Sequence, residues 1–198
     1  MSRQTNFRKE LEAMPKSDRL LLRSWSLEDA DDLFEYASKE EVGPNAGWMP
    51  HKSVDESKKI IQMFLMKKES FAIYLLGENK VIGSIGLHHH KSDYNKNSLM
   101  KEMEIGFALH PFYWGRGIAP EAVELILEHA FFNLDADIIW CGHFDFNERS
   151  KRVQEKCGFS YKLTKQEKLK VFGGMDVTSL YYAITKEEYI NKKGTEFV

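Results

Sequence analysis

Cysteine is scarce in this sequence, since its 198 residues include only Cys141 and Cys157. Their spacing matches no metal-binding motif, and a disulfide scaffold would need more of them. Both have apolar neighbours, which favours a structural over a reactive role. Long apolar runs are also missing, because none approaches the roughly 18 residues of a membrane-spanning helix. No repeat and no Pro/Gly/Ser-rich linker divides the chain.

Excess charge of one sign is absent as well. The chain has 28 Lys and Arg against 30 Asp and Glu, a net charge of −2. Such a balance predicts no basic surface for nucleic acid. The opening residues, MSRQTNFRKELEAMPKSD, are polar and carry no secretory signal. We therefore expect a cytoplasmic protein without nucleic-acid or membrane partners.

The composition that remains, 42% hydrophobic and 29% charged, is that of an ordinary globular protein. A chain of this length suits one domain with a sizeable core. We expect a single domain over residues 1–198, with a polar lead-in over 1–17 and the core over about 18–190.

Segments with strand and helix periodicity alternate along the chain. Ser26 and Ser53, each followed three residues later by an acidic side chain, predict two helix starts. Two more helices are expected over about 119–134 and 147–158. Strands are expected over 18–25, 71–77, 80–88, 101–110, 137–145, 159–169 and 178–189. This order predicts an α/β (or α+β) fold with a mixed sheet covered by helices.

The stretch HPFYWGRGIAPEAVELILEHAF places Gly115 and Gly117 directly before a helix. Glycines there can adopt positive φ and leave backbone amides open to an anion. The helix N-terminus adds its dipole, and Arg116 adds a positive charge at the rim. The same residues would also suit a plain strand-to-helix turn.

Two familiar phosphate motifs are excluded. No Gly-Lys-Ser/Thr follows the glycines, so this is not the nucleoside triphosphate loop. The third glycine of the dinucleotide motif is replaced by Pro120. A nucleotide-binding module stays open as an alternative, which predicts a preference for ATP or NAD.

The run Trp114-Gly115-Arg116-Gly117-Ile118-Ala119 resembles the Gln/Arg-x-x-Gly-x-Gly/Ala loop of the GNAT N-acetyltransferases, with Trp at the first position. RLLLRSWSLEDADDLFEYAS, EIGFALHPFYWGRGIAPEA and NERSKRVQEKCGF are similar to the ribosomal-protein N-terminal acetyltransferases (RimJ/RimL-type). The resemblance covers about residues 18–190.

The resemblance implies a mostly antiparallel seven-stranded sheet whose fourth and fifth strands splay apart, with acetyl-CoA as co-substrate and no metal. The pantetheine arm would pair with the backbone of Phe107, Ala108 and Leu109. The pyrophosphate would lie on the amides from Gly115 to Ala119. The expected cofactor-binding residues are Phe107, Ala108, Leu109, Trp114, Gly115, Arg116, Gly117, Ile118, Ala119 and Asn147.

Transfer of an acetyl group to an amine requires that the ammonium lose a proton. Glu104 is the candidate base, with Glu102 competing on the same face of the strand. Many family members carry a Tyr acid where this chain has Gln154, so the acid that protonates the leaving thiolate is open. Ser150 resembles a serine placed near the sulfur, although a helix-capping role explains it equally well. Consecutive histidines at 88–90 cannot converge on one metal ion.

These observations predict an enzyme that transfers acetyl from acetyl-CoA to a primary amine by direct attack in a ternary complex. The acceptor is a protein N-terminus or a small amine, and the protein is a monomer or a homodimer. Trp48, Met49 and Tyr94 are candidates for the acceptor wall. A CoA-binding sensor without turnover is the alternative.

Overall fold

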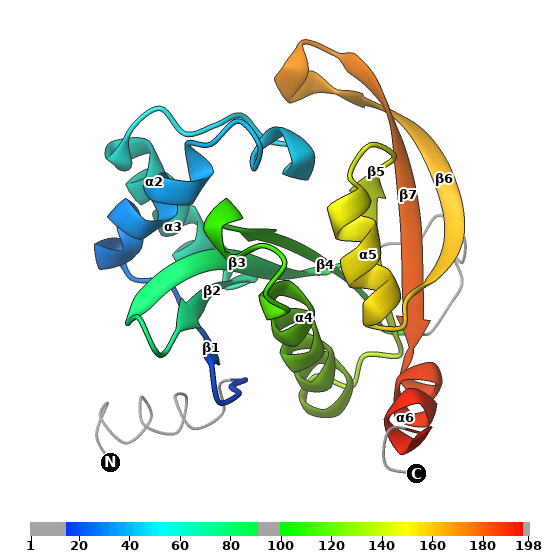
Figure 1. Ribbon diagram of the computed structural model, residues 1–198. Coiled ribbons are helices and arrows are strands. Elements are labelled where there is room, and N and C mark those ends of the chain that lie inside the picture. The colour runs from blue at the N-terminus through cyan, green and yellow to red at the C-terminus, as the bar shows by residue number, and fades with distance from the viewer. Residues whose placement is uncertain (1–14, 91–99, 196–198) are drawn as a thin grey trace.

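The computed structural model describes residues 15–90 and 100–195 and is built around one sheet (Figure 1). The expected lead-in therefore lies mostly outside the described residues, as does Tyr94. The sheet has seven strands in the order β1-β2-β3-β4-β5-β7-β6. Their bounds are β1 Leu20–Arg23, β2 Ser70–Leu75, β3 Lys80–His89, β4 Glu102–Leu109, β5 Ile138–Phe144, β6 Ser160–Leu169 and β7 Met175–Thr185.

Every neighbouring pair of strands is antiparallel except β4 and β5, which are parallel. The α/β (α+β) fold class and the mostly antiparallel seven-stranded sheet are thus confirmed. The hairpin between β2 and β3 turns at Asn79, whose φ is 51°.

Helices cover both faces of the sheet. Their bounds are α2 Ala30–Ala37, α3 Val54–Lys67, α4 Ile118–Glu128, α5 Glu148–Lys156 and α6 Lys186–Thr195. Two apolar cores are present. One contains residues of α4 and of the central strands, and the other contains residues of α2 and α3. In Figure 1, α4 and α5 lie together in front of the sheet. Within the described residues, no helix is both long and apolar enough to cross a membrane.

Both predicted caps are present. The Ser26 hydroxyl accepts the Glu28 amide and the Asp29 carboxylate accepts the Ser26 amide, so the capping box opens a short 3-10 turn before α2. The Ser53 hydroxyl accepts the amide of Glu56 at 3.2 Å and begins α3.

The expected strand over 178–189 is wrong at its end, because β7 stops at Thr185 and α6 follows. The Thr185 hydroxyl accepts the Glu188 amide, while the Glu188 carboxylate accepts the Thr185 amide. This reciprocal cap is a local helix signal. The helix expected to reach residue 134 is α-helical only to Glu128, after which a π-helical turn continues to Asn133.

The two cysteines are buried, as their apolar neighbours indicate. Burial raises the pKa of the Cys141 thiol and raises that of Cys157 to about 12. Neither thiol therefore forms the reactive thiolate readily, which fits a structural role.

Strands β4 and β5 separate after a short parallel ladder. Pairing runs from Glu102 with Ile138 to Ile105 with Cys141 and then stops, although both strands continue. The predicted splay between the fourth and fifth strands is present. Among the described residues, no strand pairs with this edge of β4 beyond Ile105.

Candidate active site

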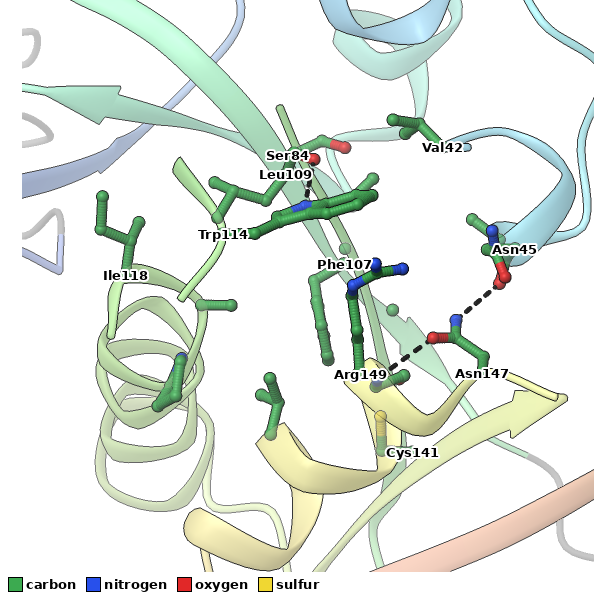
Figure 2. A pocket seen from close by; sticks show the side chains of 18 of the residues that line it. Val42, Asn45, Ser84, Phe107, Leu109, Trp114, Ile118, Cys141, Asn147 and Arg149 are labelled. Atoms are coloured by element: carbon green, nitrogen blue, oxygen red, sulfur yellow. Dashed lines mark hydrogen bonds between the residues drawn. The ribbon is translucent and has the colours of Figure 1, made fainter. Parts of the chain in front are cut away.

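A cavity of about 610 Å³ occupies the gap between the separated strands (Figure 2). Its lining comes from both layers of helices. Val42 and Phe64 contribute from the α2 and α3 side, whereas Ile118 and Val153 contribute from α4 and α5. The cavity therefore connects the two faces of the sheet through the gap.

The glycine turn forms one wall of this cavity. Gly115 and Gly117 have φ values of 76° and 74°, the left-handed conformation that the sequence predicted. A Cβ added at Gly115 would meet no atom within 4 Å, so the space above this turn is open. Helix α4 begins immediately afterwards at Ile118. The first amides of a helix have no partner within the helix, so the start of α4 beside this open turn is suited to an anion.

Trp114 joins the glycine turn to the rest of the cavity wall. Its indole N–H donates to the Leu109 carbonyl at 2.9 Å, which fixes the ring over the end of β4. The Arg149 guanidinium lies over the same ring, 4.4 Å from the ring centroid. Figure 2 shows this side chain reaching from α5 toward the indole.

The register of β4 decides which backbone groups face the gap. The His110 amide donates to Ile82 and the Glu102 carbonyl accepts from His90, both on the β3 side. Because successive residues of a strand alternate in direction, Ala108 also directs its backbone groups toward β3. Phe107 and Leu109 direct theirs toward the gap. Of the three residues expected to pair with a pantetheine arm, two thus have suitably oriented amides, while Ala108 lines the cavity.

Two of the predicted residues have other contacts. The Arg116 guanidinium lies 4.3 Å from the Phe112 ring centroid and is not part of the cavity lining. Asn147 lines the cavity, but its amide oxygen accepts the Ser150 amide and its nitrogen donates to the Asn45 carbonyl. It caps α5 and fastens a neighbouring loop.

The two acidic candidates on β4 differ in their surroundings. Glu102 is buried and accepts the Trp140 indole N–H at 2.7 Å, so its carboxylate is committed to the fold. The side chain of Glu104 is 34% exposed and lies 2.6 Å from His90 Nδ1. It lies at the end of the paired segment, on the strand face opposite that of Ile105. Glu104 is not among the residues that line the cavity itself.

Ser150 and Gln154 belong to one hydrogen-bonded chain. The buried Gln154 amide donates to the Ser150 hydroxyl at 3.2 Å and to the Gly142 carbonyl at 3.4 Å. Its oxygen accepts from His143 at 3.1 Å, which fixes the proton on Nδ1 of that imidazole. The Ser150 oxygen is thus an acceptor, and Ser150 itself lines the cavity. Gln154 thus positions Ser150.

Sequence reasoning missed the cations on this wall. Arg149, Arg152 and Lys156 all line the cavity from α5. Their spacing of three and four residues places them on one side of the helix, which a sequence pattern could have shown. In the parts of the chain that the structure describes, no group of three or more His, Cys, Asp or Glu is arranged to hold a metal ion.

A sheet with two parted parallel strands, a cavity between them and a glycine turn at its wall defines an acetyltransferase of the type that uses acetyl-CoA. The chain belongs to the GNAT family, because the model of the acetyltransferase (GNAT) domain matches residues 19–160. The fold of this family uses acetyl-CoA.

Known proteins agree with this membership. The chain is 28% identical over 180 residues to an uncharacterized N-acetyltransferase, p20, of Bacillus licheniformis, covering 87% of this chain and 96% of that one. A GNAT-family acetyltransferase of Bacillus anthracis has a similar structure, with a TM-score of 0.75 and 26% identity over 88% of this chain and 99% of that one. A spermidine N-acetyltransferase of Vibrio cholerae, solved with CoA and spermine, shares the fold at a TM-score of 0.70 and 18% identity, over 88% and 99% of the two chains. The chain is an N-acetyltransferase.

Proposed function

We propose that this protein transfers the acetyl group of acetyl-CoA to a primary amine that approaches from the sheet face carrying Glu104. The observation that carries the proposal is the cavity that passes between β4 and β5 from the glycine turn to the opposite face. A co-substrate bound on one face could thus present its acetyl group to an acceptor on the other.

In this proposal the chain holds acetyl-CoA at two places. Amides from Gly115 to Ala119 bind the pyrophosphate, helped by the N-terminus of α4. The Phe107 and Leu109 amides bind the pantetheine arm as an added strand would. The Leu109 carbonyl already accepts a hydrogen bond from the Trp114 indole. We therefore propose that Leu109 binds the pantetheine arm through its amide, as a donor, and not through its carbonyl.

Glu104 is the proposed proton acceptor. An amine is protonated at neutral pH, with a pKa of about 8 for an α-amine and about 10.4 for a lysine. Glu104, held by His90, takes this proton directly or through a water. The amine nitrogen then forms a bond to the carbonyl carbon while the carbon–sulfur bond breaks, and the electron pair leaves with the sulfur. The nitrogen, now positively charged, loses its second proton to the departing thiolate or to water, which leaves a neutral amide.

Ser150 is the proposed donor to the departing sulfur. Gln154 stands where many family members carry a tyrosine acid, and its amide donates to the hydroxyl of Ser150, which lines the cavity. A thiolate is a good leaving group, so a hydrogen bond from this hydroxyl suffices without a strong acid.

The acceptor is proposed to be either a protein N-terminus or a small amine such as a polyamine. The motif resemblance to RimJ/RimL-type enzymes favours the first, and the shared fold of a spermidine acetyltransferase keeps the second open. Trp48 and His88 line the acceptor side of the cavity.

The test is release of free thiol from acetyl-CoA in the presence of N-terminal peptides and polyamines, followed by mass spectrometry of the acceptor. We expect release above the hydrolysis background and an acceptor heavier by one acetyl group. Tight CoA binding without release for any amine would instead favour a sensor. Stabilisation by ATP or NAD in preference to CoA would contradict the proposal.

A further inference from the structure

Three glycines lie in a row across the sheet where β4 and β5 separate. Gly86 of β3 pairs with Gly106 of β4, and Gly142 of β5 lies one position beyond the end of the parallel ladder. All three line the cavity. Because Gly106 follows Glu104 by two residues and strand side chains alternate, the row lies on the sheet face that carries Glu104. The glycine row is therefore a floor on the face from which the amine is proposed to approach.

Gly106 is the open point of this floor. It is exposed within β4 and does not have the positive φ that would require a glycine. A Cβ placed there would meet no atom of the described residues within 4 Å. A glycine in the interior of a strand weakens the strand and often marks a place where a ligand comes close to the backbone. The described residues give no conformational or packing reason for this glycine, which leaves space for a ligand as its role.

Aromatic side chains lean over the two neighbouring glycines. The His88 ring occupies the place of a Cβ at Gly86, which would overlap its Nε2 atom. The Tyr181 ring lies over Gly142, where a Cβ would be only 3.1 Å from a ring carbon. The side-chain-free floor is thus confined to Gly106, with a ring on either side across the sheet.

The space above Gly106 is a narrow pit. Across the sheet it is bounded by the rings of His88 and Tyr181, and along β4 by Glu104 and Ala108, which share its face of the strand. Neighbouring strands are only about 4.8 Å apart, so rings that lean inward leave little width. An unbranched methylene chain fits such a pit, whereas a carbon that carries a side chain next to its amine would contact a ring.

The approach to this pit carries negative charge. Glu41 lines the cavity from the loop after α2, and the Glu69 carboxylate lies 3.2 Å from Nδ1 of His88 at the edge of the pit. Among the described residues, the Arg and Lys side chains that line the cavity all come from α5, on the other side. Together with Glu104, these carboxylates favour a ligand with more than one positive charge.

We propose that the acceptor is a linear polyamine whose terminal amine, on an unbranched methylene chain, enters the pit above Gly106. Its further ammonium groups lie toward Glu41 and Glu69. This inference rests on the proposed function and selects one of the two acceptor classes left open there. The transfer is the same: a nitrogen–carbon bond forms, the carbon–sulfur bond breaks, and the two protons of the ammonium go to Glu104 and to the thiolate or water. A protein N-terminus other than glycine carries a side chain beside its amine, which the pit excludes.

The experiment compares kcat/KM for thiol release with spermidine, with hexylamine and with a peptide that has an N-terminal valine. Hexylamine has the unbranched chain but a single charge, and the peptide has the branched carbon. Wild-type protein is expected to use spermidine about tenfold or more better than either.

Two kinds of variant test the two features of the pit. Gly106→Ala places a methyl group on the floor and should lower kcat/KM for spermidine about tenfold or more, while CoA affinity in calorimetry stays within about threefold. Gly77→Ala, in an exposed turn where a Cβ also meets no described atom, should behave as wild type. Glu41→Gln/Glu69→Gln should reduce the preference for spermidine over hexylamine to within about threefold. Glu155→Gln/Glu187→Gln, two exposed acids on other helices, should retain it.

Use of the peptide or of hexylamine as well as spermidine by wild-type protein would overturn this inference and leave the proposed function intact. Undiminished use of spermidine by Gly106→Ala would overturn it too, and wild-type CoA affinity shows that this variant is folded. An equal loss of CoA affinity and turnover in Gly106→Ala would also overturn it, because the glycine would then serve the co-substrate. No thiol release with any of the three amines would overturn the proposed function as well.

Discussion

The Arg149 guanidinium lies 4.4 Å above the ring of Trp114, whose indole N–H donates to Leu109 at 2.9 Å. Helix α5, the glycine turn and the end of β4 are thereby connected around the cavity. Trp114 stands at the first position of the glycine-loop motif, where the family pattern has Gln or Arg. Its ring packs against the guanidinium of Arg149 from α5.

This contact predicts a measurable coupling. Trp114→Leu and Arg149→Gln, alone and together, should show an interaction free energy of about 0.5–1 kcal/mol in urea unfolding, the usual value for an exposed cation–π pair. A control cycle combines Trp114→Leu with Arg152→Gln, and the two changes in the free energy of unfolding should then be additive. Additivity in both cycles would show that the Arg149–Trp114 contact contributes nothing.

Glu104→Gln should lower kcat by about a hundredfold or more, the typical contribution of a general base. CoA affinity should stay unchanged, because the side chain is not part of the cavity lining. Stopped thiol-release assays and calorimetry measure the two quantities. Glu155→Gln, an exposed substitution on α5, is the control. Retention of wild-type turnover in Glu104→Gln would remove the residue from the base role.

Ser150→Ala should lower kcat only about three- to tenfold, below the hundredfold expected of a full general acid. Gln154→Leu should produce a similar loss, because it releases the Ser150 hydroxyl from its donor. The combined variant should be no slower than either alone. Multiplied losses would show that Gln154 acts independently of Ser150. Ser160→Ala, on β6, controls for loss of a hydroxyl elsewhere.

Buried imidazoles make stability depend on pH. Burial lowers the pKa of His143 below its ordinary value of 6.5. As pH falls through 6.5, the unfolded chain binds a proton that the native state resists, so the free energy of unfolding falls. Urea unfolding at pH 7.5 and 5.5 should show this loss, and His143→Gln should reduce it. The same loss in the variant would contradict a role for His143. His51, His110 and His129, whose pKa values burial also lowers, account for what remains.

Local signals predicted much of the fold. Strand-like runs, one of them clearly alternating, located all seven strands, and serine caps located the starts of two helical segments. The positive φ at Gly115 and Gly117 also followed from local chemistry. The cap between Thr185 and Glu188 is an equally local signal. The strand predicted from the apolar residues of β7 extends beyond this cap to residue 189, so the prediction misses α6.

Contacts between distant residues could not be predicted in this way. Glu104 and His90 meet only because β3 and β4 pair. The carboxylate of Glu102 is instead hydrogen-bonded to the indole N–H of Trp140 on β5. The backbone of Ala108 faces β3 because of the same register. A single sequence specifies which residues are polar but not which of them the sheet brings together.

Calorimetry on two matched glycine variants shows whether the amides beside Gly115 hold the CoA diphosphate. Gly115 and Gly173 both have positive φ, 76° and 68°, and open space where a Cβ would stand. An alanine at either position should cost about 1–2 kcal/mol of stability. Gly115→Ala should also weaken CoA binding by about tenfold or more, because the methyl group covers the amides. Gly173→Ala should bind CoA as wild type does. Equal CoA affinity in the two variants would contradict binding of the diphosphate by the amides beside Gly115.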